Sequence, residues 1–403
     1  MNTQDYEVLL LNVLLTHFDK QEHIFRYTCE DFFQDITCLT IYRTARKIFE
    51  ELGVVTNVDI YERDKSLYSV IWELLKETLG FRSMIDIYIK RLYDKAVERK
   101  IADAKTAEEI KAIEEFKNKY ELKDSLIKHI SADTENFMEK YEQRKKKIIT
   151  TGYTKLDEII GSFMGGDYIA LGGGTGSGKT AFALNLANLL CFQDKQVLYF
   201  SLEMPLEQLQ NRLICLNLGL NANKLRGLNF SAEELEKFQN GLKGLKDWSL
   251  NIVCDYDLTL DKMKSYAEEQ KKKKGLDFII LDYLGLMSGF GNKSLYEKTT
   301  ILSRHIKLLA SDLDVPILVL VQLNRNTSER QDKRPQLSDI RESGAIEQDS
   351  DFVLFTYRDF DNESSFNNIK PMQILVAKNR HGINRKNVML DFDVTTQLIK
   401  ERW

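Results

Sequence analysis

Apolar side chains recur at helical spacing through the first 95 residues of the chain. Four stretches show this pattern, over residues 8–15, 39–52, 67–79 and 85–92. Gly53, directly after the second stretch, offers the left-handed residue with which many helices end. Only two of the 21 glycines and none of the four prolines precede residue 150, and so few helix breakers favour helices. We therefore expect a small all-helical domain over residues 1–95.

Residues 96–147 are richer in lysine, glutamate and alanine, and their apolar positions are sparse. A helix with so narrow an apolar face is stabilised mainly by ion pairs between neighbouring turns. We expect a helix that connects two domains or docks on another subunit. Four basic residues, 144–147, close the stretch and are interpreted as a solvated hinge in preference to a nucleic-acid patch. The linker-helix region is placed at residues 96–149.

Beyond residue 167, short apolar runs alternate with helical stretches, as in a βαβ pattern. The runs occupy residues 168–171, 197–200, 278–281, 317–321, 352–357, 373–377 and 388–392. They do not alternate with polar residues, which is typical of strands buried on both faces of a mostly parallel sheet. The last two or three runs are closely spaced and predict an antiparallel edge. The sequence thus predicts an α/β domain over residues 150–403.

The segment 173–180 fits G-x-x-x-x-G-K-[ST] between an apolar strand and a helix, which is the context that a P-loop requires. Its glycines let backbone N–H groups turn onto phosphate oxygens, and the helix N-terminus adds positive potential. Lys179 is expected to reach the β- and γ-phosphates of ATP, and the Thr180 hydroxyl to bind Mg²⁺. The expected nucleotide-binding residues are Gly173, Gly174, Thr175, Gly176, Ser177, Gly178, Lys179, Thr180 and Ala181.

Two acidic residues follow later predicted strands. Asp282 ends the strand over 278–281, where a P-loop sheet places the aspartate that holds the Mg²⁺ shell. Glu203 follows the strand over 197–200, so it should lie at the same carboxyl edge and could activate water. From the residues alone, two interpretations of Glu203 are about equally supported: a catalytic carboxylate, or a glutamate at the start of a helix. Ser201 and Pro205 also resemble a helix start.

Three further polar residues lie at strand ends. Gln322 follows the strand over 317–321, and its amide could sense the γ-phosphate. Lys378 and Arg380 follow the strand over 373–377, and on the residues alone they are surface charges.

Composition narrows the class of protein only slightly. The net charge of −4 argues against a wholly basic nucleic-acid coat, but it allows a basic channel. The five cysteines form no Cys-x-x-Cys pair, which disfavours a zinc site. No apolar run approaches the ~20 residues that span a membrane, and the N-terminus lacks the basic segment of a signal peptide. A cytoplasmic protein without a membrane partner is expected.

Several segments, taken together and in order, resemble the RecA-like motor domain of DnaB-type replicative DNA helicases. They are Ser-Leu-Glu-Met at 201–204, Leu-Asp-Tyr-Leu at 281–284, Gln-Leu-Asn-Arg at 322–325, the stretch 339–349, and Tyr-Arg-Asp at 357–359. Residues 151–157 resemble the entry segment of that domain. The resemblance is close over 150–395 and looser over 5–95.

The resemblance implies a role for each matching residue. Glu203 would be the catalytic carboxylate, Asp282 the Mg²⁺-shell aspartate, and Gln322 the link between nucleotide and DNA. Lys378 and Arg380 would be the lysine and arginine finger that act on the γ-phosphate in a neighbouring subunit.

The same resemblance implies a loop that holds DNA. Arg341, Glu342 and Gly344 match the loop that binds the phosphates of single-stranded DNA in such helicases. Glu342 is expected to contact DNA through its backbone or to orient Arg341, because a carboxylate repels phosphate.

The implied assembly is a homo-hexameric ring with an N-terminal collar, which encircles one DNA strand and moves 5′ to 3′ as ATP turns over. A primase and a helicase loader are the implied partners, in a bacterial cytoplasm or a phage-infected cell. The sequence departs from the family at three P-loop glycines, 172–174, and in its divergent N-terminal domain, which suggests a phage or mobile-element origin. The alternatives are a RecA- or RadA-like DNA-dependent ATPase and a ring-forming loader or scaffold that is not a motor.

Overall fold

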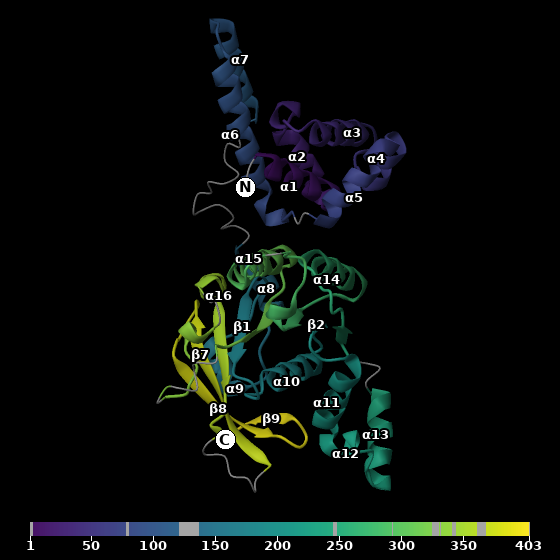
Figure 1. The fold of residues 1–403 in the computed structure, drawn as a ribbon, viewed down its shortest axis with the longest axis vertical. Coiled ribbons are helices and arrows are strands. Elements are labelled where there is room, and N and C mark those ends of the chain that lie inside the picture. The colour runs from purple at the N-terminus through teal and green to yellow at the C-terminus, as the bar shows by residue number, and fades with distance from the viewer. Residues whose placement is uncertain are drawn as a thin grey trace. The chain divides into compact units, whose positions relative to one another are not determined.

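The chain is described here by a computed structural model, over residues 3–77, 80–120, 137–244, 248–291, 293–324, 330, 332–340, 344–360 and 368–402. These residues form two compact units, Met1–Phe137 and Met138–Trp403 (Figure 1). In the part of the chain that is described, no helix combines the length and apolarity needed to cross a membrane.

The first unit is helical, as predicted. Its α-helices are α1 (Thr3–Thr16), α2 (Gln21–Tyr27), α3 (Ile36–Leu52), α4 (Asn57–Arg63), α5 (Tyr68–Glu77), α6 (Ile85–Asp103) and α7 (Ala107–Tyr120). Helix α1 lies in the core, where Leu10 and Leu14 pack with Ile89 and Leu92 of α6. Helix α3 ends at Gly53, as expected: its φ is +74°, and its N–H donates to the Phe49 carbonyl at 2.8 Å.

The expectation of one narrow-faced helix over residues 96–147 is wrong in the described part. Helix α6 continues through residue 95 to Asp103, and α7 then starts as a separate helix. A capping box separates them, because Thr106 Oγ1 accepts from Glu109 N at 3.2 Å while the Glu109 carboxylate accepts from Thr106 N at 2.9 Å. Phe116 of α7 packs on Phe32, with ring centroids 6.1 Å apart. The division into a collar and a linker stays a prediction.

The second unit is built on a mixed sheet, nine-stranded in its described part. The strands are β1 (Tyr168–Gly173), β2 (Val197–Ser201), β3 (Leu250–Val253), β4 (Phe278–Asp282), β5 (Ile317–Gln322), β6 (Phe352–Tyr357), β7 (Ile369–Asn379), β8 (Lys386–Asp393) and β9 (Leu398–Glu401). Their order is β3-β2-β4-β5-β1-β6-β7-β8-β9; in this order β3 to β6 are parallel, and β7, β8 and β9 add antiparallel neighbours. The predicted α/β class, the mostly parallel sheet and its antiparallel edge are confirmed. Among the described strands, only β3 and β9, four residues each, lie outside the predicted apolar runs.

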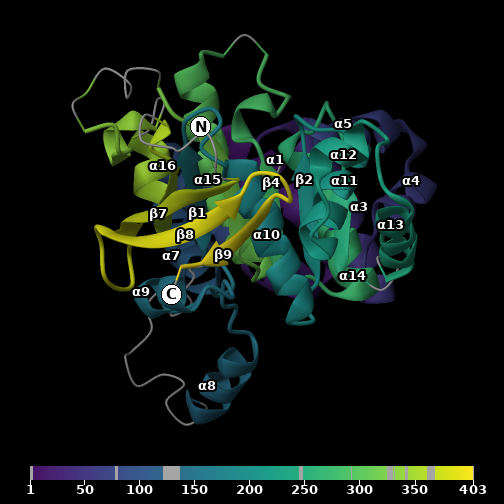
Figure 2. The same cartoon turned by 90° about the horizontal axis from the view of Figure 1, so that it is seen from below.

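Helices cover both faces of this sheet (Figures 1 and 2). On one face lie α9 (Thr154–Ile160), α10 (Lys179–Phe192) and α11 (Leu206–Leu218), whose apolar side chains share a core with Tyr199. On the other lie α14 (Leu260–Lys274) and α15 (Leu295–Leu313), and Phe200 there meets Tyr266 of α14 with 6.3 Å between ring centroids. Among the described residues, the other α-helices of this part of the chain are α8 (Phe137–Lys146), α12 (Ala222–Arg226), α13 (Ala232–Gly244) and α16 (Gly344–Asp349).

The strand register brings the ends of several strands to one edge. Gly173 at the end of β1 pairs with Gln322 at the end of β5, and Ser201 of β2 pairs with Asp282 of β4. Because these strands are parallel, the segments that follow them gather at their common carboxyl edge, where ligands of open α/β sheets bind.

Candidate functional site

The P-loop joins β1 to α10 at the carboxyl edge. Gly178 precedes the first turn of α10 with φ +96°, a conformation that side chains disfavour. Gly173 is needed for a different reason, since a Cβ there would clash with the hydroxyl oxygens of Thr356 and Ser177. Those two hydroxyls are 2.7 Å apart in a buried hydrogen bond, which ties the loop to β6. The P-loop is therefore anchored to the sheet through β6, while Thr175 and Gly176 remain exposed.

Lys179 lies inside this loop. Its ammonium donates to the carbonyl oxygens of Gly173 at 2.6 Å and Gly174 at 3.2 Å. Burial lowers the pKa of Lys179, while the carboxylates of Asp282 and Glu203 raise it in opposition. The ammonium is thus held by weak neutral acceptors, which the charged oxygens of a phosphate could replace at little cost.

Asp282 lies at the end of β4 and is almost fully buried. Burial raises the pKa of its carboxyl, and hydrogen bonds from Tyr199 and Thr180 oppose that rise. The Tyr199 hydroxyl donates at 2.8 Å. A threonine hydroxyl and a carboxylate are oxygen donors of the kind that Mg²⁺ prefers, so Thr180 and Asp282 fit a magnesium site.

Glu203 lies in a short turn between β2 and α11. Ser201 Oγ donates to the Met204 carbonyl at 2.7 Å, and Leu202 N donates to the Asp282 carbonyl at 2.8 Å, so the turn is fixed at both ends. Helix α11 begins only at Leu206, after Pro205 as its N-cap. Glu203 therefore lies outside the first helical turn, and it lines the same cavity as Lys179. This placement favours the catalytic interpretation over that of a helix-start glutamate.

These side chains surround one cavity of about 410 Å³, a volume within the range of small-ligand sites. The expected residues that line it are Gly174, Thr175, Gly176, Gly178, Lys179, Thr180, Ala181, Glu203, Asp282 and Gln322. Ser177 lines an adjoining cavity of about 640 Å³, together with Gly174, Thr175 and Gln322. The residues predicted from separate motifs thus converge at one place.

The cavity also has walls that the sequence did not reveal. Arg358 places its guanidinium 5.4 Å from the ring centroid of Phe392 and donates to the Gly176 carbonyl at 3.2 Å. Gln397 lines the same wall with φ +66°, and its carbonyl accepts from Asn185 of α10 at 2.8 Å. This wall, part planar cation and part apolar ring, suits the base and ribose of a nucleotide. Arg212 of α11 lines the cavity as well.

The Lys378 and Arg380 pair does not reach this cavity. Asn379, between them, pairs with Phe352 at the start of β6, whereas Thr356, four residues on, pairs with Gly173 of the P-loop. Four residues of strand correspond to about 13 Å, so the pair lies at the opposite, amino edge of the parallel strands.

The segment expected to bind DNA is described only at its borders. Arg341 and Glu342 lie outside the described residues, while Gly344 is the first residue of α16. Gln322 ends β5 at the cavity, and two residues later Asn324 N donates to the Asp339 carbonyl at 2.8 Å. A short, hydrogen-bonded path therefore runs from the nucleotide cavity to the segment just before Arg341.

The fold and the cavity together define a P-loop ATPase domain of the RecA-like class, preceded by a helical unit. Residues 148–401 match the family described as DnaB-like helicase C terminal domain. The chain belongs to this family.

Individual relatives agree. The "Replicative DNA helicase DnaB" of Geobacillus stearothermophilus is 33% identical over 373 residues, which are 86% of this chain and 79% of that protein. The "Replicative DNA helicase DnaC" of Bacillus subtilis is 38% identical over 263 residues, 64% of this chain and 58% of that protein. A solved structure of a DnaB-like replicative helicase, described together with its interactions with primase, matches the fold over 100% of both chains with a TM-score of 0.65 at 24% identity.

Proposed function

We propose that the chain is an ATP-dependent replicative DNA helicase, which works as a homo-hexameric ring and moves 5′ to 3′ along single-stranded DNA. One observation carries the proposal. The P-loop, Glu203, Asp282 and Gln322 converge on one cavity, while Lys378 and Arg380 lie at the other edge of the sheet. Because Lys378 and Arg380 lie too far from the phosphate loop of their own subunit to act there, we infer that they complete the site of a neighbouring subunit. The names of the two relatives supply the reaction class.

Each residue then has a chemical task. The P-loop N–H groups and Lys179 bind the triphosphate, and Thr180 and Asp282 hold Mg²⁺, which neutralises charge on the phosphate oxygens when bound. Glu203 orients the attacking water and accepts its proton. Gln322 passes the state of the γ-phosphate to the segment that carries the DNA loop. Arg380 and Lys378 stabilise the charge that develops in the neighbouring site.

DNA binding is assigned to Arg341, Glu342 and Gly344. In a ring, one arginine from each subunit can follow a phosphate chain without reading bases. Such a pore would also reconcile DNA binding with a net charge of −4. A primase and a loader are the proposed partners, and the primase interactions described for the similar solved helicase support the first of them. We place the activity in the bacterial cytoplasm or a phage-infected cell, where replicating DNA lies.

The test is ATP hydrolysis with and without single-stranded DNA, by wild type and by Glu203→Gln. We expect DNA to stimulate the wild type, and the variant to lose about 100-fold or more in kcat while it still binds nucleotide. Glu207→Gln is the matched control, because Glu207 is an exposed glutamate in the first turn of α11. It should hydrolyse ATP at the wild-type rate. Equal rates for Glu203→Gln and wild type would favour a scaffold that is not a motor.

A further inference from the structure

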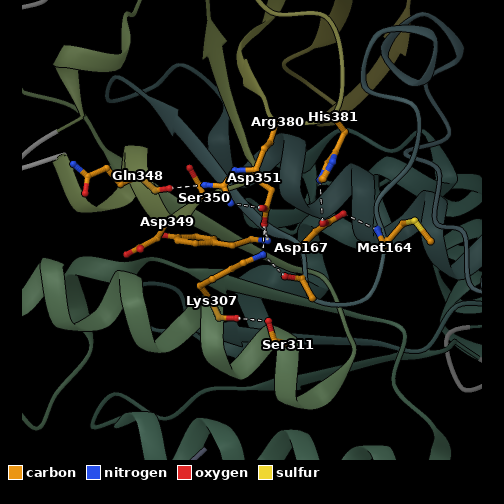
Figure 3. Close-up of polar contacts among 12 residues, drawn as sticks. Met164, Asp167, Lys307, Ser311, Gln348, Asp349, Ser350, Asp351, Arg380 and His381 are labelled. Atoms are coloured by element: carbon orange, nitrogen blue, oxygen red, sulfur yellow. Dashed lines mark hydrogen bonds and ion pairs between the residues drawn. The ribbon is translucent and has the colours of Figure 1, made fainter. Parts of the chain in front are cut away.

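Arg380 is held by a polar cluster at the amino edge of the sheet (Figure 3). Its Nη1 donates to Asp351 Oδ1 at 3.2 Å and its Nη2 donates to the Gln348 carbonyl at 2.7 Å. Its backbone N–H donates to the Asp351 carbonyl at 2.9 Å. Asp351 therefore contacts both the backbone and the side chain of Arg380. These contacts fix the position of the Arg380 backbone and the orientation of its guanidinium.

The Asp351 carboxylate is itself rigidly held. Its side chain is only 4% exposed, and Oδ2 accepts from Tyr168 N at 2.9 Å and from Lys307 Nζ at 2.6 Å. Figure 3 shows Lys307 reaching from its helix toward this carboxylate. A buried carboxylate with donors on both oxygens has little freedom to rotate. It therefore restricts the orientation of the Arg380 guanidinium, which is hydrogen-bonded to it.

Lys378 is held in a similar way. Its ammonium donates to the Ser350 carbonyl at 2.7 Å and to the Glu347 carbonyl. The guanidinium of Arg380 nevertheless remains accessible, since its side chain is 47% exposed. An arginine that is oriented by its neighbours but still open to solvent can meet a phosphate without first losing conformational freedom.

The surroundings of Asp351 also allow two other roles. Its carboxylate, Asp167 and His381 lie close enough to share a metal ion, but the Lys307 ammonium already lies 2.6 Å from the Asp351 carboxylate. Asp351 could instead act within its own subunit, because Tyr168 begins β1, the strand that leads into the P-loop. The experiment has to separate this second role from an effect on Arg380.

We propose that Asp351 is the positioning residue for Arg380, and that it acts through Arg380 on the nucleotide site of a neighbouring subunit. The inference rests on the proposed function of Arg380 as a trans-acting finger. Asp351 holds the Arg380 guanidinium in one orientation. The finger is therefore preorganised before it contacts the nucleotide site of the neighbouring subunit.

The test uses Asp351→Asn in the full-length ring, since asparagine keeps an acceptor oxygen and removes the charge. Alone, this variant should lose about tenfold in kcat for ATP while KM changes less than about twofold. Subunits carrying Asp351→Asn are then mixed with Lys179→Ala subunits. Where the two meet in the productive order, an intact P-loop faces an intact finger, so hydrolysis should recover above the mean of the separate variants. No recovery, with recovery in a parallel Arg380→Ala plus Lys179→Ala mixture, would overturn the proposal and leave the finger in place.

That parallel mixture also distinguishes failure of the trans role of Arg380 from failure of the positioning role of Asp351. If neither mixture recovers, the trans role of Arg380 fails, and the proposal for Asp351 fails with it. A double variant provides a second arm: in an Arg380→Ala background, Asp351→Asn should lower kcat no further. A further large loss would show that Asp351 acts through β1 and would contradict the proposal.

Asp167→Asn is the matched control. Asp167 is also a largely buried carboxylate at this edge, but it accepts from Met164 N at 2.7 Å and lies 3.8 Å from His381. This variant should keep the wild-type kcat. If Asp351→Asn lowers the melting temperature or prevents ring assembly, Asp351→Glu replaces it, because it keeps the charge opposite Lys307 and displaces the carboxylate by one methylene. The positioning role would be refuted if a folded Asp351→Glu ring has the wild-type kcat and any Asp351→Asn ring that assembles has it as well.

Discussion

The hydroxyl of Tyr199 donates a 2.8 Å hydrogen bond to a carboxylate oxygen of Asp282. Both side chains are buried, Tyr199 in the middle of β2 and Asp282 at the end of the neighbouring strand β4. Burial raises the pKa of Tyr199 well above its usual value, so the phenol keeps its proton and remains a donor. Tyr199 therefore holds the Asp282 carboxylate in place, and Thr180 forms a second hydrogen bond with it.

Tyr199→Phe should weaken magnesium binding, because partners that orient a metal ligand commonly change metal affinity by about tenfold or more. We expect the Mg²⁺ concentration for half-maximal ATP hydrolysis to rise about tenfold, while kcat at saturating Mg²⁺ stays near that of wild type. Mg²⁺-dependent binding of a fluorescent ATP analogue gives a readout that does not depend on turnover.

Tyr168→Phe is the control for that variant. Tyr168 is also a fully buried tyrosine in the same sheet, but it begins β1 at the amino edge, away from the cavity. The Mg²⁺ concentration for half-maximal ATP hydrolysis by Tyr168→Phe should equal that of wild type. An unchanged requirement in Tyr199→Phe would remove Tyr199 from the metal site.

Arg380→Ala should abolish most hydrolysis although Arg380 lies at the edge of its own sheet opposite the P-loop. Arginine fingers contribute about a thousandfold or more to kcat in P-loop enzymes, and we expect a loss of that order. Mixed rings of Arg380→Ala and Lys179→Ala subunits should recover part of the activity. Arg402→Ala is the control, because Arg402 is a half-exposed arginine paired with Asp391, and its rate should be unaffected. Full activity in pure Arg380→Ala rings would exclude the finger.

The stability of the motor unit should depend on the ionisation of Asp261. Burial raises the pKa of Asp261 to about 6, while Lys264 opposes the rise. The folded state therefore binds the proton more tightly than the unfolded chain, and this carboxyl lowers stability as the pH rises from about 4 to about 6. Asp261→Asn removes this loss, and the free energy of unfolding at pH 8 should increase by about 1 kcal/mol, with no gain near pH 4.

Urea unfolding of the full chain, followed by circular dichroism at both pH values, measures that difference. Asp257→Asn is the control, since Asp257 is 79% exposed in its side chain and pairs loosely with Lys262 at 3.6 Å. Its substitution should leave the pH dependence unchanged. A stability gain for Asp261→Asn that is equal at pH 4 and pH 8 would show that ionisation of Asp261 is not its cause.

The sequence predicted those parts of the site that depend on local order. The P-loop is a contiguous motif, and Glu203, Asp282 and Gln322 each follow a buried apolar strand. Because parallel strands carry their ends to one edge, locating the strands was enough to bring these residues together. The prediction of a parallel sheet and the convergence of these residues therefore have the same physical basis.

Features that depend on long-range register could not be predicted in this way. Gln397 reaches the cavity only because the hairpin of β8 and β9 folds back onto Asn185 of α10. In the sequence Tyr199 is one more residue of an apolar strand, and its hydroxyl acquires a function only when β4 lies alongside. Arg358 was part of a recognised segment, but nothing in the sequence placed it against Phe392.

The break between α6 and α7 does have a local signal in the sequence. Thr106 and Glu109 form a Thr-x-x-Glu capping box that marks the start of α7. The uniform lysine and glutamate composition around them favours a single helix and so leads to the wrong prediction. Phe116, an aromatic residue in that charged stretch, indicated a packed face.

Unwinding of a forked DNA duplex with a 5′ tail tests the central claim most directly. With ATP and Mg²⁺, the wild-type protein should separate the strands of the fork, and it should leave a duplex that carries only a 3′ tail intact. Glu203→Gln should bind the same fork and leave it intact, while Glu207→Gln should unwind it as wild type does. Strand exchange without unwinding, or unwinding that survives in Glu203→Gln, would contradict the account of this chain as an ATP-driven helicase.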